Sequence, residues 1–121
     1  MPPSGSNLEV KVVEGISHLA LPTRLDASNA RELLDTLRDE LGVGHTQLCV
    51  NCGKTESIDS TALGVLIQAL KRARSQGGDL VLANVGDAVR MVLAITRVDR
   101  VCRVFDSEDL AHIALRGVVE A

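Results

Sequence analysis

Apolar residues recur along this chain with two alternating periods, and this alternation constrains the fold more than any other feature. After the second of five short β-rich runs, each run is followed by a stretch with apolar residues every three or four positions, as on one face of a helix. The predicted order is therefore β-β-α-β-α-β-α-β-α, an α/β fold with a mixed β-sheet and about four helices. The five predicted strands span residues 8–13, 16–21, 46–50, 80–83 and 101–105.

Turn and capping residues set the ends of these elements. Glu14-Gly15 fits a two-residue hairpin turn. Asp26 or Ser28 can cap the first helix, and the second begins near Ser60 and ends at Gly77-Gly78. A third helix is predicted over residues 87–96 with Val89, Val92, Leu93 and Thr96 inward, and Ser107 is predicted to cap the last helix.

Length and charge narrow the class of protein. The 121 residues suffice for one domain, predicted over residues 8–121, and the Pro-, Gly- and Ser-containing segment 1–7 is predicted to be a disordered N-terminal tail. The net charge is −3, and the densest basic cluster (Lys71, Arg72, Arg74) falls where cations complement a helix C-terminus, so no nucleic-acid binding is expected. No apolar run approaches the roughly 20 residues of a membrane span, and a cytoplasmic location without membrane insertion is expected.

The cysteines and histidines predict no metal site and no cofactor. Three cysteines are an odd number, and Cys49 and Cys52 form a C-x-x-C without the further ligands that zinc requires, so they and Cys102 are predicted to be packing residues. The three histidines, which are His18, His45 and His112, are far apart in the sequence and are predicted to be isolated from one another.

Sequence signatures of catalysis are also missing. Gly53-Lys54-Thr55 resembles the end of a P-loop, but Leu48 stands where the first glycine belongs. No G-x-S-x-G elbow and no nucleophile with an adjacent base can be assigned, so no enzyme activity is predicted and no catalytic residue is named.

One segment, Ser57 to Gly64, places two hydroxyls and a carboxylate at the start of an amphipathic helix. Asp59 or Ser60 can serve as a plain helix cap there. The same position also suits a phosphate, because unpaired N–H groups and the helix dipole attract anions. Gly64, one turn into the helix, costs about 1 kcal/mol relative to Ala, which indicates close approach by some other group.

At these residues the sequence resembles the STAS family, and within it the bacterial anti-sigma-factor antagonists. Residues 58–66 resemble the family signature I-D-S-[ST]-G-L-G-x-L. The resemblance covers about residues 8–114 and extends to Leu25-Asp26-Ala27, to the K-R-A-R-x-x-G-G-x-L stretch at 71–80, and to the V-F-x-S-E turn at 104–108.

This resemblance implies a STAS fold and a partner switch. An unphosphorylated antagonist binds an anti-sigma factor that is also its serine kinase, phosphorylation releases it, and a metal-dependent serine phosphatase resets it. The phosphoacceptor of the family corresponds to Ser60, and Thr61 is a second candidate. The residues expected to bind the partner are Asp26, Asp59, Ser60, Thr61, Ala62 and Gly64.

Three departures from the family pattern stand out. Ala62 replaces the usual Gly and adds a methyl beside the switch, which bears on partner choice. Pro22-Thr23 replaces a common Gly before Leu25-Asp26, and Arg97-Val98 replaces the usual Gly-Leu after the third helix. The alternative reading is a STAS accessory subunit of a lipid or anion transporter; such modules often lack the Asp-Ser-hydroxyl motif that this chain keeps.

Overall fold

The computed structural model describes residues 8–120, with side chains to residue 117. Within these residues the nine predicted main elements occur in the predicted order. The tail expected over residues 1–7 lies outside the described residues. The main strands are β1 (Val10–Val13), β2 (Ile16–Ala20), β4 (Gln47–Asn51), β6 (Asp79–Ala83) and β7 (Val104–Phe105), and the helices are α1 (Ala30–Gly42), α2 (Ser60–Ser75), α3 (Asp87–Ile95) and α4 (Glu108–Glu120).

The main sheet has five strands in the order β1-β2-β4-β6-β7. Only the β1–β2 pair is antiparallel, and the other pairs are parallel, as the helical connections between them require. The predicted hairpin turn is confirmed, because Val13 pairs with Ile16 across Glu14 (φ 52°) and Gly15 (φ 77°). Two positive φ angles are what a two-residue turn needs to match the strand twist.

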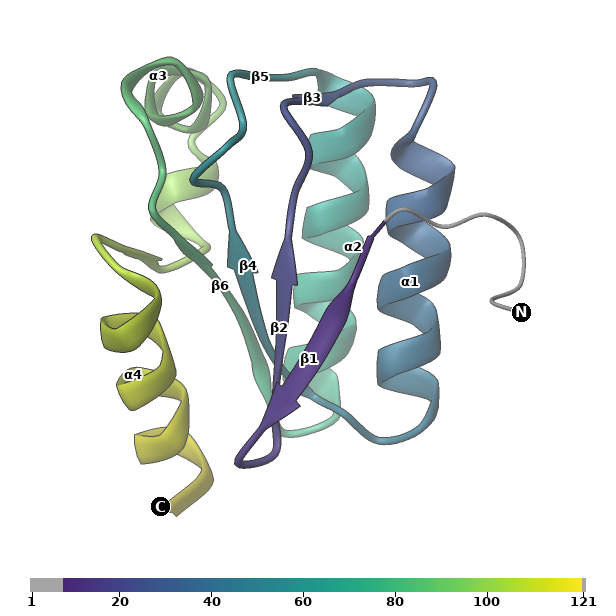
Figure 1. Ribbon diagram of the computed structural model, residues 1–121, viewed down its shortest axis with the longest axis vertical. Coiled ribbons are helices and arrows are strands. Elements are labelled where there is room, and N and C mark those ends of the chain that lie inside the picture. The colour runs from purple at the N-terminus through teal and green to yellow at the C-terminus, as the bar shows by residue number, and fades with distance from the viewer. Residues whose placement is uncertain (1–7, 121) are drawn as a thin grey trace.

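Helices cover the two faces of the sheet unequally. Figure 1 shows α1 and α2 side by side against one face, α4 against the other, and α3 at one end of the molecule. The larger core is leucine-rich and lies between the sheet and α1 and α2. A smaller core on the other face joins Ile16, Cys49 and Val81 to Ala111 and Leu115 of α4. Because α4 packs mainly on β4 and β6, part of β1 and β2 stays open on that face.

Two short strands were missed by the sequence analysis. β3 (Arg24–Leu25) and β5 (Ser57–Ile58) pair in parallel and form a separate two-stranded sheet. Strands of two residues are too short to show a period of two, so no sequence pattern announces them. Leu25 and Ile58 are both buried, which anchors this small sheet to the larger core.

Several predicted details are wrong. α1 is preceded by Asn29 as its N-cap, without a side-chain cap, so neither Asp26 nor Ser28 caps it. Thr96, which was predicted to point inward, is exposed, because α3 has already ended at Ile95. Its hydroxyl donates a hydrogen bond to the carbonyl of Val92. The strand predicted over residues 101–105 shrinks to Val104–Phe105, since the turn η2 (Val98–Arg100) and its exit occupy the preceding residues.

Candidate functional site

The start of α2 exposes two hydroxyls beside a capping carboxylate. Asp59 is the N-cap, and its Oδ1 accepts a hydrogen bond from the N–H of Ala62 at 3.0 Å. Ser60 and Thr61 are exposed, and among the described residues neither hydroxyl makes a hydrogen bond to the protein. Of the two candidate caps, Asp59 and Ser60, Asp59 is the one that caps the helix, and the exposed Ser60 is the first residue of the helix.

The small β3–β5 sheet brings the segment of Asp26 to the same end of the molecule. Leu25 pairs with Ile58, and the N–H of Asp59 donates to the carbonyl of Leu25 at 3.0 Å. Asp26 and Asp59 thus each follow directly after one of two paired strands, and both are partly exposed. The Ser28 hydroxyl and backbone N–H both donate to Asp26 and hold the pKa of its carboxyl below the usual value.

Ala62 and Gly64 occupy opposite sides of α2. The sequence analysis placed Ala62 among the residues that contact a partner, but Ala62 is fully buried in the larger core, so its methyl packs against the protein instead. Gly64 is exposed, and a methyl group added to it would meet no atom within 4 Å. No described part of this chain makes the close approach expected at Gly64, and the space above it is open.

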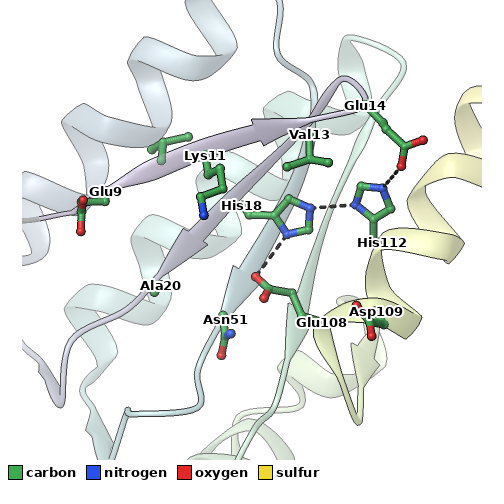
Figure 2. A pocket seen from close by; sticks show the side chains of 11 residues that line it. Glu9, Lys11, Val13, Glu14, His18, Ala20, Asn51, Glu108, Asp109 and His112 are labelled. Atoms are coloured by element: carbon green, nitrogen blue, oxygen red, sulfur yellow. Dashed lines mark hydrogen bonds and ion pairs between the residues drawn. The ribbon is translucent and has the colours of Figure 1, made fainter.

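A second cluster of polar side chains lies on the opposite face of the sheet, where the sequence predicted isolated histidines. That prediction is wrong for two of them. His18 Nε2 lies 2.8 Å from His112 Nδ1, and the two rings lie edge to edge, 16° from parallel, with centroids 4.9 Å apart. Carboxylates sit at both ends, with Glu108 Oε2 3.1 Å from His18 Nδ1 and Glu14 Oε1 2.7 Å from His112 Nε2 (Figure 2). The contact joins residues 94 positions apart, which sequence spacing cannot reveal.

The cluster borders a groove of about 700 Å³ between the β1–β2 hairpin and the first turns of α4 (Figure 2). The charged residues and histidines that line it are Glu9, Lys11, Glu14, His18, Glu108, Asp109 and His112. Four carboxylates against one lysine give this groove an acidic character that attracts cations.

The C-x-x-C pair does not act as a unit. Cys49 belongs to the smaller core under α4, whereas Cys52 belongs to the larger core on the other side of the sheet. All three cysteines are buried and unpaired, as packing residues would be, and burial raises the pKa of each thiol to about 12. Cys102 is buried in a turn rather than on the predicted strand.

No helix in the described part of the chain is both long enough and apolar enough to cross a membrane.

The fold agrees with a sequence match to a known family over most of the chain. The sequence profile of the STAS domain matches residues 7–111. This chain belongs to the STAS domain family. The resemblance and the predicted STAS fold are therefore confirmed.

Relatives of this STAS protein carry a regulatory name. A Thermotoga neapolitana protein named "Putative anti-sigma factor antagonist TM1081 homolog" is 34% identical over 108 residues, which cover 88% of this chain and 96% of that protein. The crystal structure of a Thermotoga maritima protein, titled "putative anti-sigma factor antagonist", is 31% identical and superposes with a TM-score of 0.84 over 90% of this chain and 94% of that one. The chain is thus related to anti-sigma factor antagonists along nearly its whole length.

The fold is shared more widely than that name. A sulfate transporter family protein from Wolinella succinogenes, 21% identical, superposes with a TM-score of 0.72 over 92% of this chain and 93% of that one. At that identity only the fold is shared. The fold by itself therefore does not separate a sigma-factor regulator from a transporter module.

Proposed function

We propose that this STAS protein is an anti-sigma factor antagonist that docks on an anti-sigma factor and is released when Ser60 is phosphorylated. The observation that carries the proposal is the exposed, unbonded Ser60 hydroxyl at the first position of α2, next to Asp59. A kinase can reach that hydroxyl without unfolding any element. Thr61, equally exposed, is the second candidate acceptor.

Within the described residues no side chain accepts a hydrogen bond from the Ser60 hydroxyl, which is consistent with this role. In phosphoryl transfer the metal ions, the positioning groups and the catalytic base belong to the kinase, so the acceptor needs only access. The proposed kinase is the anti-sigma factor itself, and a metal-dependent serine phosphatase would restore the free hydroxyl. The action is proposed to take place in the cytoplasm, without direct contact with nucleic acid and without membrane insertion.

Electrostatics explain how one phosphate could end the docking. A phosphoserine adds roughly −1.5 to −2 charges at neutral pH, and a helix N-terminus tolerates such a charge in the free protein. In a complex the phosphate would be desolvated beside Asp26 and Asp59, and would face whatever partner groups accept the neutral serine. A penalty of about 3 kcal/mol weakens binding roughly 100-fold, because each 1.4 kcal/mol is a factor of ten.

The proposed docking surface lies at the end of the molecule formed by β3, β5 and the first turns of α2. It consists of five residues that are each partly or fully exposed: Asp26, Asp59, Ser60, Thr61 and Gly64. Ala62 is left out of the contact set because it is buried. Its methyl can influence docking only through the packing of α2.

The test compares phosphorylation and partner affinity for wild type, Ser60→Ala and Ser60→Glu, with Ser57→Ala as the matched control on an exposed serine of β5. The kinase is the anti-sigma factor encoded nearest to this chain's gene. We expect one phosphate on wild type and on Ser57→Ala, none on Ser60→Ala, and weak docking of Ser60→Glu. Phosphate on Ser60→Ala would move the acceptor to Thr61 or elsewhere. Equal affinity of the phosphorylated and free forms would refute the switch and favour the transporter-accessory role.

A further inference from the structure

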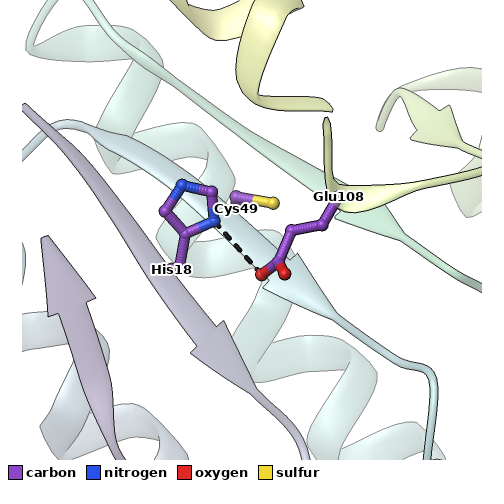
Figure 3. Close-up of side chains that lie close together, drawn as sticks. All are labelled: His18, Cys49 and Glu108. Atoms are coloured by element: carbon purple, nitrogen blue, oxygen red, sulfur yellow. Dashed lines mark hydrogen bonds and ion pairs between the residues drawn. The ribbon is translucent and has the colours of Figure 1, made fainter. Parts of the chain in front are cut away.

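We propose that His18, Cys49 and Glu108 form a binding site for Zn²⁺ at the floor of the acidic groove. Each residue offers one ligand atom, and the three atoms lie within 4.8 Å of one another (Figure 3). The imidazole, thiol and carboxylate are the three kinds of side chain that bind zinc in proteins. The sequence predicted no metal site, because these ligands come from three distant parts of the chain.

The fold holds the three ligands together from separate elements. His18 on β2 pairs with Cys49 on β4, so both side chains point to the face of the sheet that α4 covers. Glu108 is the first residue of α4 and is held over that face by Ala111 and Leu115, which pack in the smaller core. The site therefore needs no rearrangement of the backbone.

The spacing of the ligand atoms suits a single small ion. Zinc binds nitrogen and oxygen at about 2.0–2.2 Å and sulfur at about 2.3 Å, so neighbouring ligands of a tetrahedral site lie roughly 3.3–3.6 Å apart. His18 Nδ1 and Glu108 Oε2 are already 3.1 Å apart. Since no pair of the three ligand atoms exceeds 4.8 Å, side-chain rotations that move an atom by about 1 Å complete the arrangement.

The hydrogen bonds around His18 have room for one positive charge beyond two neutral rings, and Zn²⁺ at its Nδ1 can supply it in place of a proton. Glu14, His112, His18 and Glu108 form a chain with three contacts, each of which needs one proton if both carboxylates are ionised. Two neutral imidazoles carry only two protons, so the third contact is completed either by a further proton on one ring or by a metal ion. With Zn²⁺ on Nδ1, the His18 Nε2–H donates to His112 and the His112 Nε2–H donates to Glu14, so two protons satisfy both remaining bonds. A metal-bound histidine usually has its other ring N–H held in this way.

The groove supplies both the route and the fourth ligand. His18 and Glu108 line it, whereas Cys49 is fully buried beneath them, so an ion that enters would meet the carboxylate and imidazole first. A zinc site with three protein ligands keeps one position for water, which the open groove provides. The thiol selects against Mg²⁺ and Ca²⁺, which prefer oxygen ligands, and a thiol that coordinates zinc loses its proton.

Cobalt substitution tests the site in the full chain without a histidine tag. The protein is stripped with a chelator and titrated with Co²⁺, whose tetrahedral thiolate complexes show visible ligand-field bands and a near-ultraviolet charge-transfer band. We expect one Co²⁺ per chain, both kinds of band, and displacement by one equivalent of Zn²⁺, which binds more tightly than cobalt. Cys49→Ser should lose the charge-transfer band, while Cys52→Ser, the matched control from the opposite core, should keep it.

Two variants outside the buried core keep the proposal testable if Cys49→Ser fails to fold. Glu108→Gln, at a side chain 39% exposed, should weaken cobalt binding more than 100-fold, and His112→Gln by about 10- to 100-fold, because His112 acts only as the partner that orients His18. Absence of the bands in wild type, their persistence in Cys49→Ser, or unchanged affinity in Glu108→Gln would each overturn the site. Failure of the Ser60 switch would leave these results unaffected.

Discussion

Replacing Gly64 by Ala should stabilise the protein while weakening its docking. Gly64 lies in the second turn of α2, and an added methyl meets no atom within 4 Å. The only remaining effect on folding is helix propensity, where Ala is favoured over Gly by about 1 kcal/mol. For a domain of this size that corresponds to a rise in melting temperature of roughly 3–6 °C. On the proposed docking surface, the same methyl enters a closely packed interface, where overpacking costs about 1–3 kcal/mol and weakens binding by about 5- to 150-fold.

Two further glycines provide controls for this experiment. Gly117 of α4 is also exposed with open space around it, so Gly117→Ala should stabilise the protein without changing docking. Gly78 is the opposite case, because a methyl there would lie 1.9 Å from the carbonyl oxygen of Thr46, which accepts the N–H of Asp79. Gly78→Ala should therefore cost about 1–3 kcal/mol. Thermal and urea unfolding measure stability, and calorimetry measures docking. Destabilisation by Gly64→Ala would refute the open surface, and unchanged docking would remove Gly64 from the interface.

The remaining predictions concern Asp59 and the buried thiols. Asp59→Ala removes the cap on Ala62 and should cost about 0.5–2 kcal/mol in urea unfolding, whereas Asp59→Asn keeps a cap and should retain most of the stability. If docking depends on the charge of Asp59, both variants dock weakly; normal docking of Asp59→Asn would assign Asp59 a capping role alone. Burial raises the pKa of the Cys52 and Cys102 thiols to about 12, so at pH 8 only roughly one in ten thousand is the reactive thiolate. Mass spectrometry should find both unalkylated in the folded protein and labelled in denaturant, and rapid labelling of the folded protein would contradict their burial.

Local patterns predicted the elements that are long enough to show a period. The apolar stripe of α1 and the caps at Asp59 and Ser107 were predicted correctly, because capping and periodicity depend on neighbours within a few residues. The strand predicted over residues 101–105 was too long, since an apolar run does not reveal that a turn such as η2 shortens it. Thr96 was placed inward by extending the stripe of α3 one position past its end.

The candidate switch was found from sequence because its residues are contiguous. Asp59, Ser60 and Thr61 are neighbours at a helix start, and both the motif and the capping chemistry can be read locally. The burial of Ala62 could not be read with the same certainty, because the face of a helix at its first turn depends on what packs beside it. Only the pairing of β3 with β5 brings Asp26 to the same end of the molecule, through two strands of two residues each.

The sequence by itself determined the order of strands and helices, the hairpin turn and the place of the exposed serine, because each depends on interactions within a few residues along the chain. The tertiary structure alone decided which face of the sheet each side chain occupies. His18, Cys49 and Glu108 meet only because β2 and β4 pair in one register and α4 returns across that face. The separations of these three residues along the sequence do not predict that they meet, since sheet register and helix docking depend on burial of the whole core. Two of the three histidines predicted to be isolated are therefore in contact, and the two cysteines of the C-x-x-C sequence belong to different cores.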